Sequence, residues 1–255
     1  AFMQDGKALQ GCTSHNLGQT FSKSSDIKFL DRDGTQKFAW TTSWGLSTRT
    51  IGGLIMTHAD DDGMIMPPRL APYQVGILPF IHDDGDRAKI LDFCETLRKR
   101  LADKGVTARI DASDARTSDK MWAAIKKGVP LRVEVGMREM AEGSITCARR
   151  DLGKDGKKKM PVDEFIAGAQ GMLDAMQADM LAAARTRLKS MVTDVKTLAE
   201  AREFFAGGKT LGGVRMEAGL LQDAAFEALK KDFSVTPRCL PFEDAGKKVI
   251  VAKAY

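Results

Sequence analysis

Strand-type and helix-type segments alternate between Tyr73 and Arg149, and this alternation constrains the fold more than any other feature. The strand-type segments are "QVGILPF", "VTARID", "LRVEVG" and "SITCARR", and we predict helices in "DRAKILDFCETLRKRLADKG" and "SDKMWAAIKKG" between the first three. A chain that returns to a strand after each helix builds one sheet covered by those helices. The alternation therefore predicts a small α/β domain with a largely parallel or mixed sheet.

Capping residues mark the ends of these two predicted helices. Gly105 and Gly128 stand just past the last helical residues. Glycine is favoured there because the C′ position adopts a left-handed backbone. Ser118 is the predicted N-cap of the second helix, since a hydroxyl accepts a hydrogen bond from a free backbone N–H.

The residues before this domain predict strands and one helix. "DIKFL" and "KFAWTT" flank "DRDGTQ", whose Asp-Gly pair is typical of a hairpin turn. Ile51, Leu54 and Ile55 then follow helical spacing and predict a helix with a buried face. The prolines of "PPRLAP" end that pattern. We place a domain boundary there, which gives a first domain at residues 1–67.

The residues after the α/β domain predict a third region at 161–255. The basic loop "GKDGKKK" closes the second domain, residues 68–160, and a helical segment is predicted from Pro161 to about Ala206. Its methionines are predicted to fill the core. A further boundary is predicted at 207–213, followed by a helix at 220–231 and a final strand, "KKVIVAKAY".

Composition narrows the class of protein. The chain has 255 residues, 43% of them hydrophobic, and a formal net charge of +5, which permits a nucleic-acid partner without requiring one. The sequence contains no run of about 18 apolar residues, the length that a membrane-spanning helix needs. We therefore expect a soluble, cytoplasmic protein. The sequence starts at Ala1 on a strand-like segment, and we expect it to be a piece of a longer chain. The cysteines are scattered, and their spacing predicts neither a zinc site nor a disulfide framework: Cys12, Cys94, Cys147 and Cys239.

Two polar clusters could carry chemistry. "SWGLSTR" places Arg49 at a strand-to-helix junction, where free N–H groups favour an anion. An arginine at such a site could bind a phosphate through two N–H donors or stack on a base. The alternative is an ordinary helix start with a capping hydroxyl and a solvated arginine. "LQGCTSHNLGQ" is the second cluster, and by itself it is equally compatible with a polar loop around a hydrogen-bonded His15.

Longer motifs around these clusters resemble a known family. "MQDGKALQGCTSHNLGQTFSK", "FAWTTSWGLSTRTIGGLIMTHADDDGMIMPPRLAP" and "GVPLRVEVG" are similar to the prolyl-tRNA synthetases of the archaeal and eukaryote-like type, which are class II aminoacyl-tRNA synthetases. The resemblance runs from Met3 to about Asp151 and returns in the tail. It implies part of an antiparallel-sheet catalytic domain, then a mixed-sheet α/β anticodon-binding domain, then an α+β C-terminal domain.

The resemblance also implies roles for individual residues. Arg49 would be the arginine of the third class II motif, which contacts an ATP phosphate and acts in catalysis. Gln10, Thr13 and Ser47 match positions that contact ATP, while the proline pocket is implied to include His15, Ser43, Trp44 and Gly45. The "HADDDG" loop is expected to close this half-site. The implied reaction is ATP-dependent activation of L-proline and its transfer to tRNA(Pro), with Mg2+ accompanying ATP, in a homodimeric enzyme without membrane contact.

The implied tRNA contacts lie in the second domain. Arg109, Arg116, Arg132 and Glu134 are candidates, together with Lys120 and Lys126, although a charged run is usually a solvated face. Glu134 could accept hydrogen bonds from a guanine edge. The C-terminal Tyr255 matches a terminal tyrosine that packs toward the active site. Zinc is not expected, because only Cys239 lies in the region where the family carries its cysteine ligands.

Two hypotheses follow for the function. The first is a proline–tRNA ligase, of which this chain is the C-terminal portion. The first two class II motifs are missing from it, so the chain alone is not expected to be active. The second is a stand-alone tRNA-binding module derived from the C-terminal half of the synthetase. The encoding sequence upstream of Ala1 distinguishes them.

Overall fold

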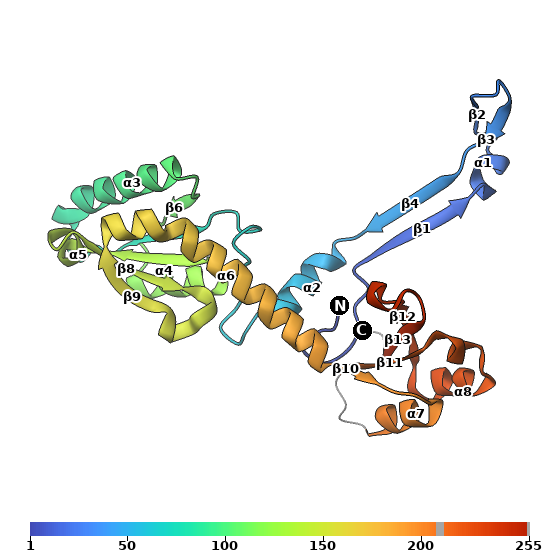
Figure 1. Ribbon diagram of the computed structural model, residues 1–255. Coiled ribbons are helices and arrows are strands. Elements are labelled where there is room, and N and C mark those ends of the chain that lie inside the picture. The colour runs from blue at the N-terminus through green and yellow to red at the C-terminus, as the bar shows by residue number, and fades with distance from the viewer. Residues whose placement is uncertain (208–211, 254–255) are drawn as a thin grey trace. The chain divides into compact units, whose positions relative to one another are not determined.

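The computed structural model describes residues 1–207 and 212–253. Contacts group the chain into two units (Figure 1). One unit combines residues 1–57 with 188–255, and the other contains residues 58–187. Each unit has its own buried apolar cluster, as the alternating pattern and the helical spacing predict. The mixed α/β class that we predict is thus confirmed.

The second unit is built on a five-stranded mixed sheet in the order β6-β5-β7-β8-β9. The first three of these strands are parallel, and β8 and β9 continue the sheet in antiparallel register. Their bounds are β5 (Val75–Pro79), β6 (Ala108–Ile110), β7 (Leu131–Val135), β8 (Ser144–Arg149) and β9 (Lys157–Pro161). All five residues of β5 are buried, which is typical of a parallel strand covered on both faces.

Helices cover both faces of this sheet. Residues of the long helices α3 and α6 join Ile77 and Val133 in one core, whereas α4 packs with Leu78, whose side chain points to the opposite face. Gly105 and Gly128 follow α3 and α4 with φ of +77° and +72°, which confirms both predicted stops. The helical bounds are η1 (Asp84–Asp86), α3 (Arg87–Asp103), α4 (Thr117–Lys126), α5 (Met137–Ala141), η2 (Arg150–Gly156) and α6 (Val162–Ser190).

Three local expectations differ from the structure. Ser118 is not the N-cap, because α4 already begins at Thr117 after an extended Arg116. Part of the predicted basic loop is strand β9, since Lys157–Pro161 pairs with β8. The predicted division at 160 also separates α6 from its own core, in which Phe165 and Leu173 are buried. The domain limits 1–67, 68–160 and 161–255 stay predictions.

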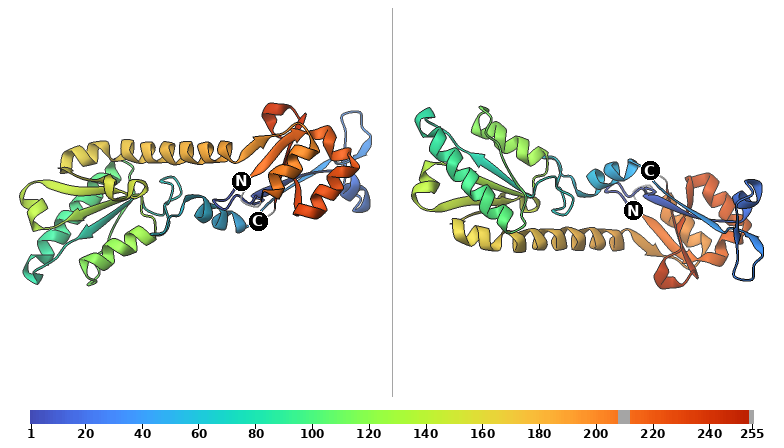
Figure 2. Two further views of the ribbon diagram at one scale, coloured as in Figure 1. Left: turned by 90° about the horizontal axis from the view of Figure 1, so that it is seen from below. Right: turned by 90° about the horizontal axis from the view of Figure 1, so that it is seen from above.

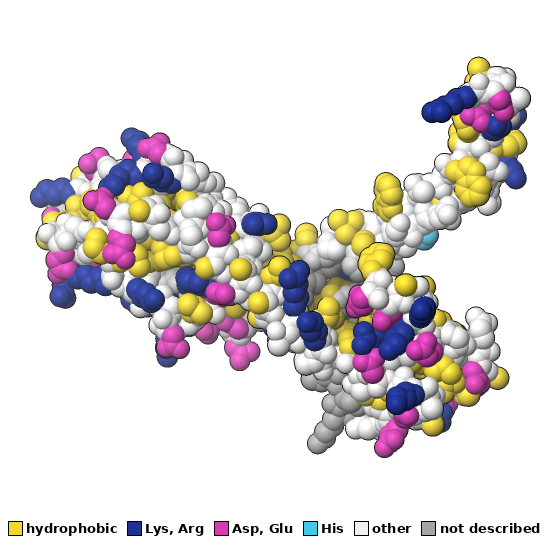
Figure 3. Space-filling view, viewed as in Figure 1, with side chains coloured by type: hydrophobic (Ala, Val, Ile, Leu, Met, Phe, Trp, Pro, Cys, Tyr) yellow, Lys and Arg dark blue, Asp and Glu magenta, His cyan; other side chains and the backbone are white. Residues whose placement is uncertain are grey.

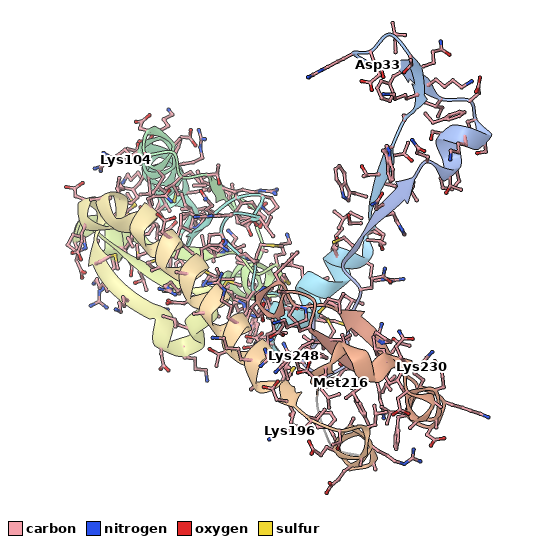
Figure 4. All side chains as sticks on the ribbon, turned by 45° about the vertical axis from the view of Figure 1, so that its right-hand side comes forward. Asp33, Lys104, Lys196, Met216, Lys230 and Lys248 are labelled. Carbon is pink, nitrogen blue, oxygen red and sulfur yellow. The ribbon has the colours of Figure 1, made fainter. Side chains whose placement is uncertain are left out.

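The first part of the other unit is a long two-stranded ribbon. Strands β1 (Cys12–Gly18) and β4 (Thr41–Leu46) run side by side in antiparallel register (Figure 2). Between them lie helix α1 (Thr20–Ser24) and the hairpin β2 (Lys28–Leu30) and β3 (Gln36–Phe38). The turn of that hairpin contains Gly34 with φ of +77°, and Asp33 marks its tip in Figure 4. The predicted hairpin is thus confirmed, and α2 (Arg49–His58) follows the ribbon.

The rest of this unit is a four-stranded sheet in the order β10-β11-β13-β12. Helices α7 and α8 pack on it around Met216, labelled in Figure 4. Strand β10 interrupts the predicted helix to Ala206 because it pairs with β11, whereas the final strand is confirmed. The bounds are β10 (Val192–Asp194), α7 (Leu198–Ala206), β11 (Gly213–Glu217), η3 (Ala218–Gln222), α8 (Ala224–Phe233), β12 (Val235–Cys239), η4 (Phe242–Asp244) and β13 (Lys248–Lys253).

Two sequence expectations lie wholly or partly outside the described residues. The boundary expected at 207–213 includes residues 208–211, and the packing expected of Tyr255 concerns the last residue. The start of the chain is anchored next to the end of the described part. The backbone N–H of Ala8 donates to the carbonyl of Lys253 at 3.0 Å, and Phe2 packs near Ala252.

Candidate functional site

One face of the ribbon gathers most of the predicted site residues. The register of β1 and β4 pairs Thr13 with Gly45 and His15 with Ser43, so these positions share a face. A cavity of about 330 Å³ opens there. Its lining holds seven predicted residues: Gln10, Thr13, His15, Ser43, Gly45, Ser47 and Arg49. Residues as far apart in the sequence as Gln10 and Arg49 thus meet at one site because the two strands of the ribbon pair with each other.

The polar groups of this cavity are held by short hydrogen bonds. Gln10 Nε2 donates to Thr13 Oγ1 at 2.7 Å. Ser47 Oγ accepts from the backbone N–H of Arg49 at 3.3 Å, and its carbonyl accepts from Thr50 Oγ1 at 2.9 Å. Ser47 therefore caps α2, whose first residue is Arg49. The capped end presents the positive pole of the helix and an arginine to the cavity.

The side chain of Arg49 is available to a ligand. It is exposed, and no carboxylate in residues 1–207 or 212–253 forms an ion pair with it. An arginine that is not paired within the protein keeps its planar set of donors for an anion. Among the described residues that line the cavity, hydroxyl and amide groups thus lie beside the guanidinium of Arg49, which forms no ion pair there.

Trp44 is not part of this cavity, in contrast to the prediction. Its neighbours Ser43 and Gly45 face the cavity, and successive side chains of a strand point to opposite faces. Trp44 pairs instead with Ser14 across the ribbon, and its Nε1 donates to Ser14 Oγ at 2.8 Å. The indole is 78% exposed on that other face.

The predicted buried face of α2 is also wrong for the described chain. No residue of α2 is buried, and Ile51 is 61% exposed. The preceding segment approaches α2 closely at Gly53, where an added Cβ would lie 2.8 Å from Leu9 Cδ2. Large apolar side chains are also exposed along the ribbon and its hairpin (Figure 3): Phe21, Ile27, Phe29, Leu30, Trp40, Trp44 and Leu46. An apolar surface of this extent is typical of one that binds another protein segment.

The acidic loop is held within the second unit, and the expectation that it closes the half-site stays a prediction. Asp60 belongs to the second unit, where both of its carboxylate oxygens bind the guanidinium of Arg150. Asp60 Oδ1 also accepts from the N–H groups of Asp62 and Gly63. These donors lower the pKa of Asp60, the hydrogen bond from Arg150 most of all. The loop is thus a structural connection of the second unit.

The second unit has a cationic region of its own. Lys120 is 4% exposed, and within the described residues its ammonium group has no hydrogen-bond or ion-pair partner. It lines two cavities, of about 280 Å³ and about 760 Å³. Asp111 lines the smaller one. Burial by itself would raise the pKa of Asp111, but hydrogen bonds from Ser113 and the charges of Lys120 and Lys127 lower it.

The four residues predicted to contact tRNA lie in different surroundings. Arg109 lines the smaller cavity, 5.8 Å from the centre of the Tyr73 ring, and Arg116 lines the larger one. Arg132 and Glu134 lie on β7 and pair with each other at 3.5 Å. Glu134 also binds Lys157 at 2.6 Å, and its side chain is only 7% exposed. Contact of Glu134 with a guanine edge would require both ion pairs to open.

Comparison with known proteins identifies the relatives of this chain. A family model described as an anticodon-binding domain matches residues 74–171. The proline–tRNA ligase of Bdellovibrio bacteriovorus is 40% identical over the whole chain and 55% of its own length, and proline–tRNA ligase 2 of Anaeromyxobacter dehalogenans is 41% identical with the same shares. The solved prolyl-tRNA synthetase of Cryptosporidium parvum, complexed with L-proline and AMP, matches with a TM-score of 0.85 and 29% identity, over 98% of this chain and 56% of that one.

The chain is similar to prolyl-tRNA synthetases over its whole length. It spans about half the length of the curated relatives it matches. The matched anticodon-binding model covers β5 through the first part of α6, which is the five-stranded sheet with the α6 residues that complete its core. The family resemblance seen in the sequence is thus confirmed.

Two further findings concern metals and membranes. Among residues 1–207 and 212–253, no three His, Cys, Asp or Glu side chains form a group suited to a metal ion. The expected lack of zinc stays a prediction. No helix in the described part of the chain is long and apolar enough to span a membrane.

The sequence interpretation missed the special position of Lys120. It was one candidate in a run of charged residues, yet it lies on the inner face of α4. The spacing in the sequence could have indicated this position, because Lys120, Ala124 and Lys127 follow the i, i+4, i+7 pattern of one helix face. In the structure, Ala124 of this face packs with Leu78. A lysine on such a face is either buried or placed at a cavity.

Proposed function

We propose that this chain is the C-terminal portion of a proline–tRNA ligase. The complete enzyme would activate L-proline with ATP to prolyl-adenylate and transfer the prolyl group to tRNA(Pro). The observation that carries the proposal is the cavity on the ribbon, where seven residues implied by the family resemblance meet. The proteins with 40% and 41% identity are named for this activity.

The phosphate groups of ATP would bind at the start of α2. Attack of the proline carboxylate on the α-phosphate builds negative charge on phosphate oxygens, and prearranged donors stabilise such charge. Arg49 supplies a planar cation, and the N–H groups of the helix end add partial positive charge. Gln10, Thr13 and Ser47 would position the nucleotide through their amide and hydroxyl groups, which are already oriented by hydrogen bonds.

Proline would occupy the part of the cavity between the two strands. His15 and Ser43 supply polar groups there, and Gly45 leaves open space, since nothing lies within 4 Å of its missing Cβ. Trp44 lies on the opposite face of the ribbon and does not line this cavity in the described chain. Among the described lining residues there is no carboxylate, so this chain offers no Mg2+ ligand in the cavity, and the ion would arrive with ATP.

The second unit would bind the anticodon of tRNA(Pro). RNA loops are recognised through unstacked bases and phosphates, which suit cavities lined by cations. Lys120 lines both cavities of this unit, Arg109 lines the smaller one and Arg116 the larger one. The exposed apolar surfaces of the ribbon and α2 support a further part of the enzyme packing on them. The homodimer, and a location in the cytoplasm, belong to this proposal as well.

The test uses the complete gene product and proline-dependent exchange of pyrophosphate into ATP. Arg49→Ala should lower the exchange rate about 10²- to 10³-fold, as loss of one prearranged donor does. Arg32→Ala is the matched control, because Arg32 lies in the hairpin turn away from the cavity. A complete gene product without proline-dependent exchange would refute the ligase and favour the tRNA-binding module. Exchange within twofold of wild type in Arg49→Ala would refute the phosphate contact.

A further inference from the structure

A second cavity of the first unit shares part of its lining with the cavity proposed to bind ATP. Its volume is about 590 Å³, and all of its lining residues belong to this one unit. Residues 10–13 line both cavities, and the second cavity is also lined by Arg238 and Cys239 of β12. A cavity of this size is typical of a site for a small organic molecule. We call it the two-thiol cavity, after Cys12 and Cys239.

Both thiols of this cavity are open to reagents. Cys12 and Cys239 are exposed, whereas the other two cysteines of the chain are buried in the second unit. The thiolate is the form of cysteine that reacts. Burial raises the pKa of Cys239, which leaves less of that side chain as thiolate. Cys12 is part of the lining that the two cavities share, so its reaction affects both of them.

Arg238 adds a cationic donor to the two-thiol cavity. Its Nε donates to the carbonyl of Ala252 at 3.4 Å. Its Nη2 is buried and has no hydrogen-bond partner within residues 1–207 and 212–253. A buried N–H group without an acceptor is unfavourable, so a ligand that supplies an acceptor is stabilised there. A carboxylate is the acceptor that suits a guanidinium best.

We propose that the two-thiol cavity binds a small anionic disulfide and that Cys12 exchanges with it. A carboxylate of the ligand accepts a hydrogen bond from Arg238, and the thiolate of Cys12 attacks one sulfur of the disulfide. A bond forms between that sulfur and Cys12, the bond within the ligand breaks, and the other half leaves as a thiolate. The ligand itself is the oxidant, because its departing half is reduced.

The group attached to Cys12 lies next to residues that we propose to position ATP. Gln10 Nε2 donates to Thr13 Oγ1 at 2.7 Å, and Cys12 lies between these two residues in the sequence. A bulky adduct on Cys12 leaves little room for this arrangement beside a bound nucleotide. Modification therefore lowers the use of ATP until the mixed disulfide is reduced. This consequence rests on the proposed ligase function, whereas binding of the disulfide does not.

The experiment treats the reduced, complete gene product with oxidised glutathione, which is anionic, or with cystamine, which is cationic. Peptide mass spectrometry follows the mixed disulfide at Cys12, and each rate is divided by the rate of a free cysteine peptide with the same reagent. We expect this normalised rate to be about tenfold higher for oxidised glutathione, as one charge-assisted hydrogen bond allows. Proline-dependent exchange of pyrophosphate should fall about tenfold on modification and return with dithiothreitol.

Variants separate the two parts of the inference. Arg238→Gln should react with both reagents at normalised rates within about twofold of each other, because the cationic donor is lost. Arg202→Gln is the matched control, since Arg202 pairs with Asp232 at 2.5 Å and is not among the described lining residues. Cys12→Ser should make exchange insensitive to oxidised glutathione, whereas Cys239→Ser should remain sensitive. Each variant is compared with its own untreated form.

Equal normalised rates for the two reagents in the wild-type protein would overturn the anion site. The modification site fails if Cys12→Ser is inhibited as strongly as wild type, or if protein modified at Cys12 keeps its untreated exchange rate. If Arg238→Gln does not fold, Arg238→Met decides by the same criterion. Failure of the proposed function is recognised separately. In that case the untreated wild-type protein shows no proline-dependent exchange, while the comparison of the two reagents still tests the site.

Discussion

The ribbon of β1 and β4 and the sheet of the second unit place similar short strands in opposite environments. Every residue of β5 is buried under helices, whereas no residue of β1 or β4 is. The ribbon nevertheless carries the polar cavity of the proposed active site. Burial therefore does not mark the region that we propose to be catalytic. The second unit is covered by its own helices, and the ribbon presents a half-site with uncovered apolar surroundings.

Arg49 differs in a similar way from the buried charges of the second unit. In the second unit, Glu134 binds Arg132 and Lys157, and Arg150 binds Asp60, so these charges hold the structure together. At the start of α2, which follows the ribbon, Arg49 has no partner of this kind in the described chain. A buried charge requires a partner because its desolvation costs free energy. A charged side chain that binds a ligand has to be free of ion pairs within the protein.

The largest expected contrast between the two units is in thiol reactivity. Burial raises the pKa of Cys94 and of Cys147 to about 12 in the second unit, whereas Cys12 and Cys239 are exposed in the other. At pH 8 we expect the two exposed thiols of the 255-residue chain to react with Ellman's reagent roughly a thousandfold faster than the buried pair. Simultaneous reaction of all four thiols before denaturant is added would contradict the difference in burial.

A smaller contrast is expected in the effect of side-chain truncation. Leu131 is fully buried in the second unit, so Leu131→Ala should lower the free energy of unfolding by about 2 to 5 kcal/mol. Ile51→Ala should change it by about 0.5 kcal/mol or less, because that side chain is 61% exposed. Urea denaturation of the 255-residue chain measures both values. A cost at Ile51 equal to that at Leu131 would show that α2 is covered.

The smallest effect is expected in the pH dependence of stability at Asp60. The hydrogen bond from Arg150 lowers the folded-state pKa of Asp60 below its ordinary value of 3.8. The stabilisation is therefore fully present above pH 3.8 and is lost as the pH falls through the lower, folded-state value. Asp60→Asn should be less stable than wild type at pH 6, with a difference that shrinks as the pH approaches 3. Urea denaturation over this range tests it, and a difference independent of pH would argue against the ion pair.

Local patterns were sufficient for many elements. The Asp-Gly turn predicted the hairpin of β2 and β3, and Gly105 and Gly128 end their helices as expected, since each depends on the backbone preferences of a few residues. The sequence could also have predicted that Trp44 does not line the cavity. Its neighbours Ser43 and Gly45 line it, and successive side chains of a strand point to opposite faces. The family motifs named seven of the residues that line the cavity.

The sequence by itself determined the class of fold, the turns and helix ends, and the family to which its motifs are related. Only the tertiary structure decided that Lys157–Pro161 is a strand, that Lys120 lies between two cavities, and that Asp60 binds Arg150 from 90 positions away. The physical reason is that periodicity and turn preference act over a few residues. Pairing of distant strands and charges depends instead on which surfaces the folded chain brings together.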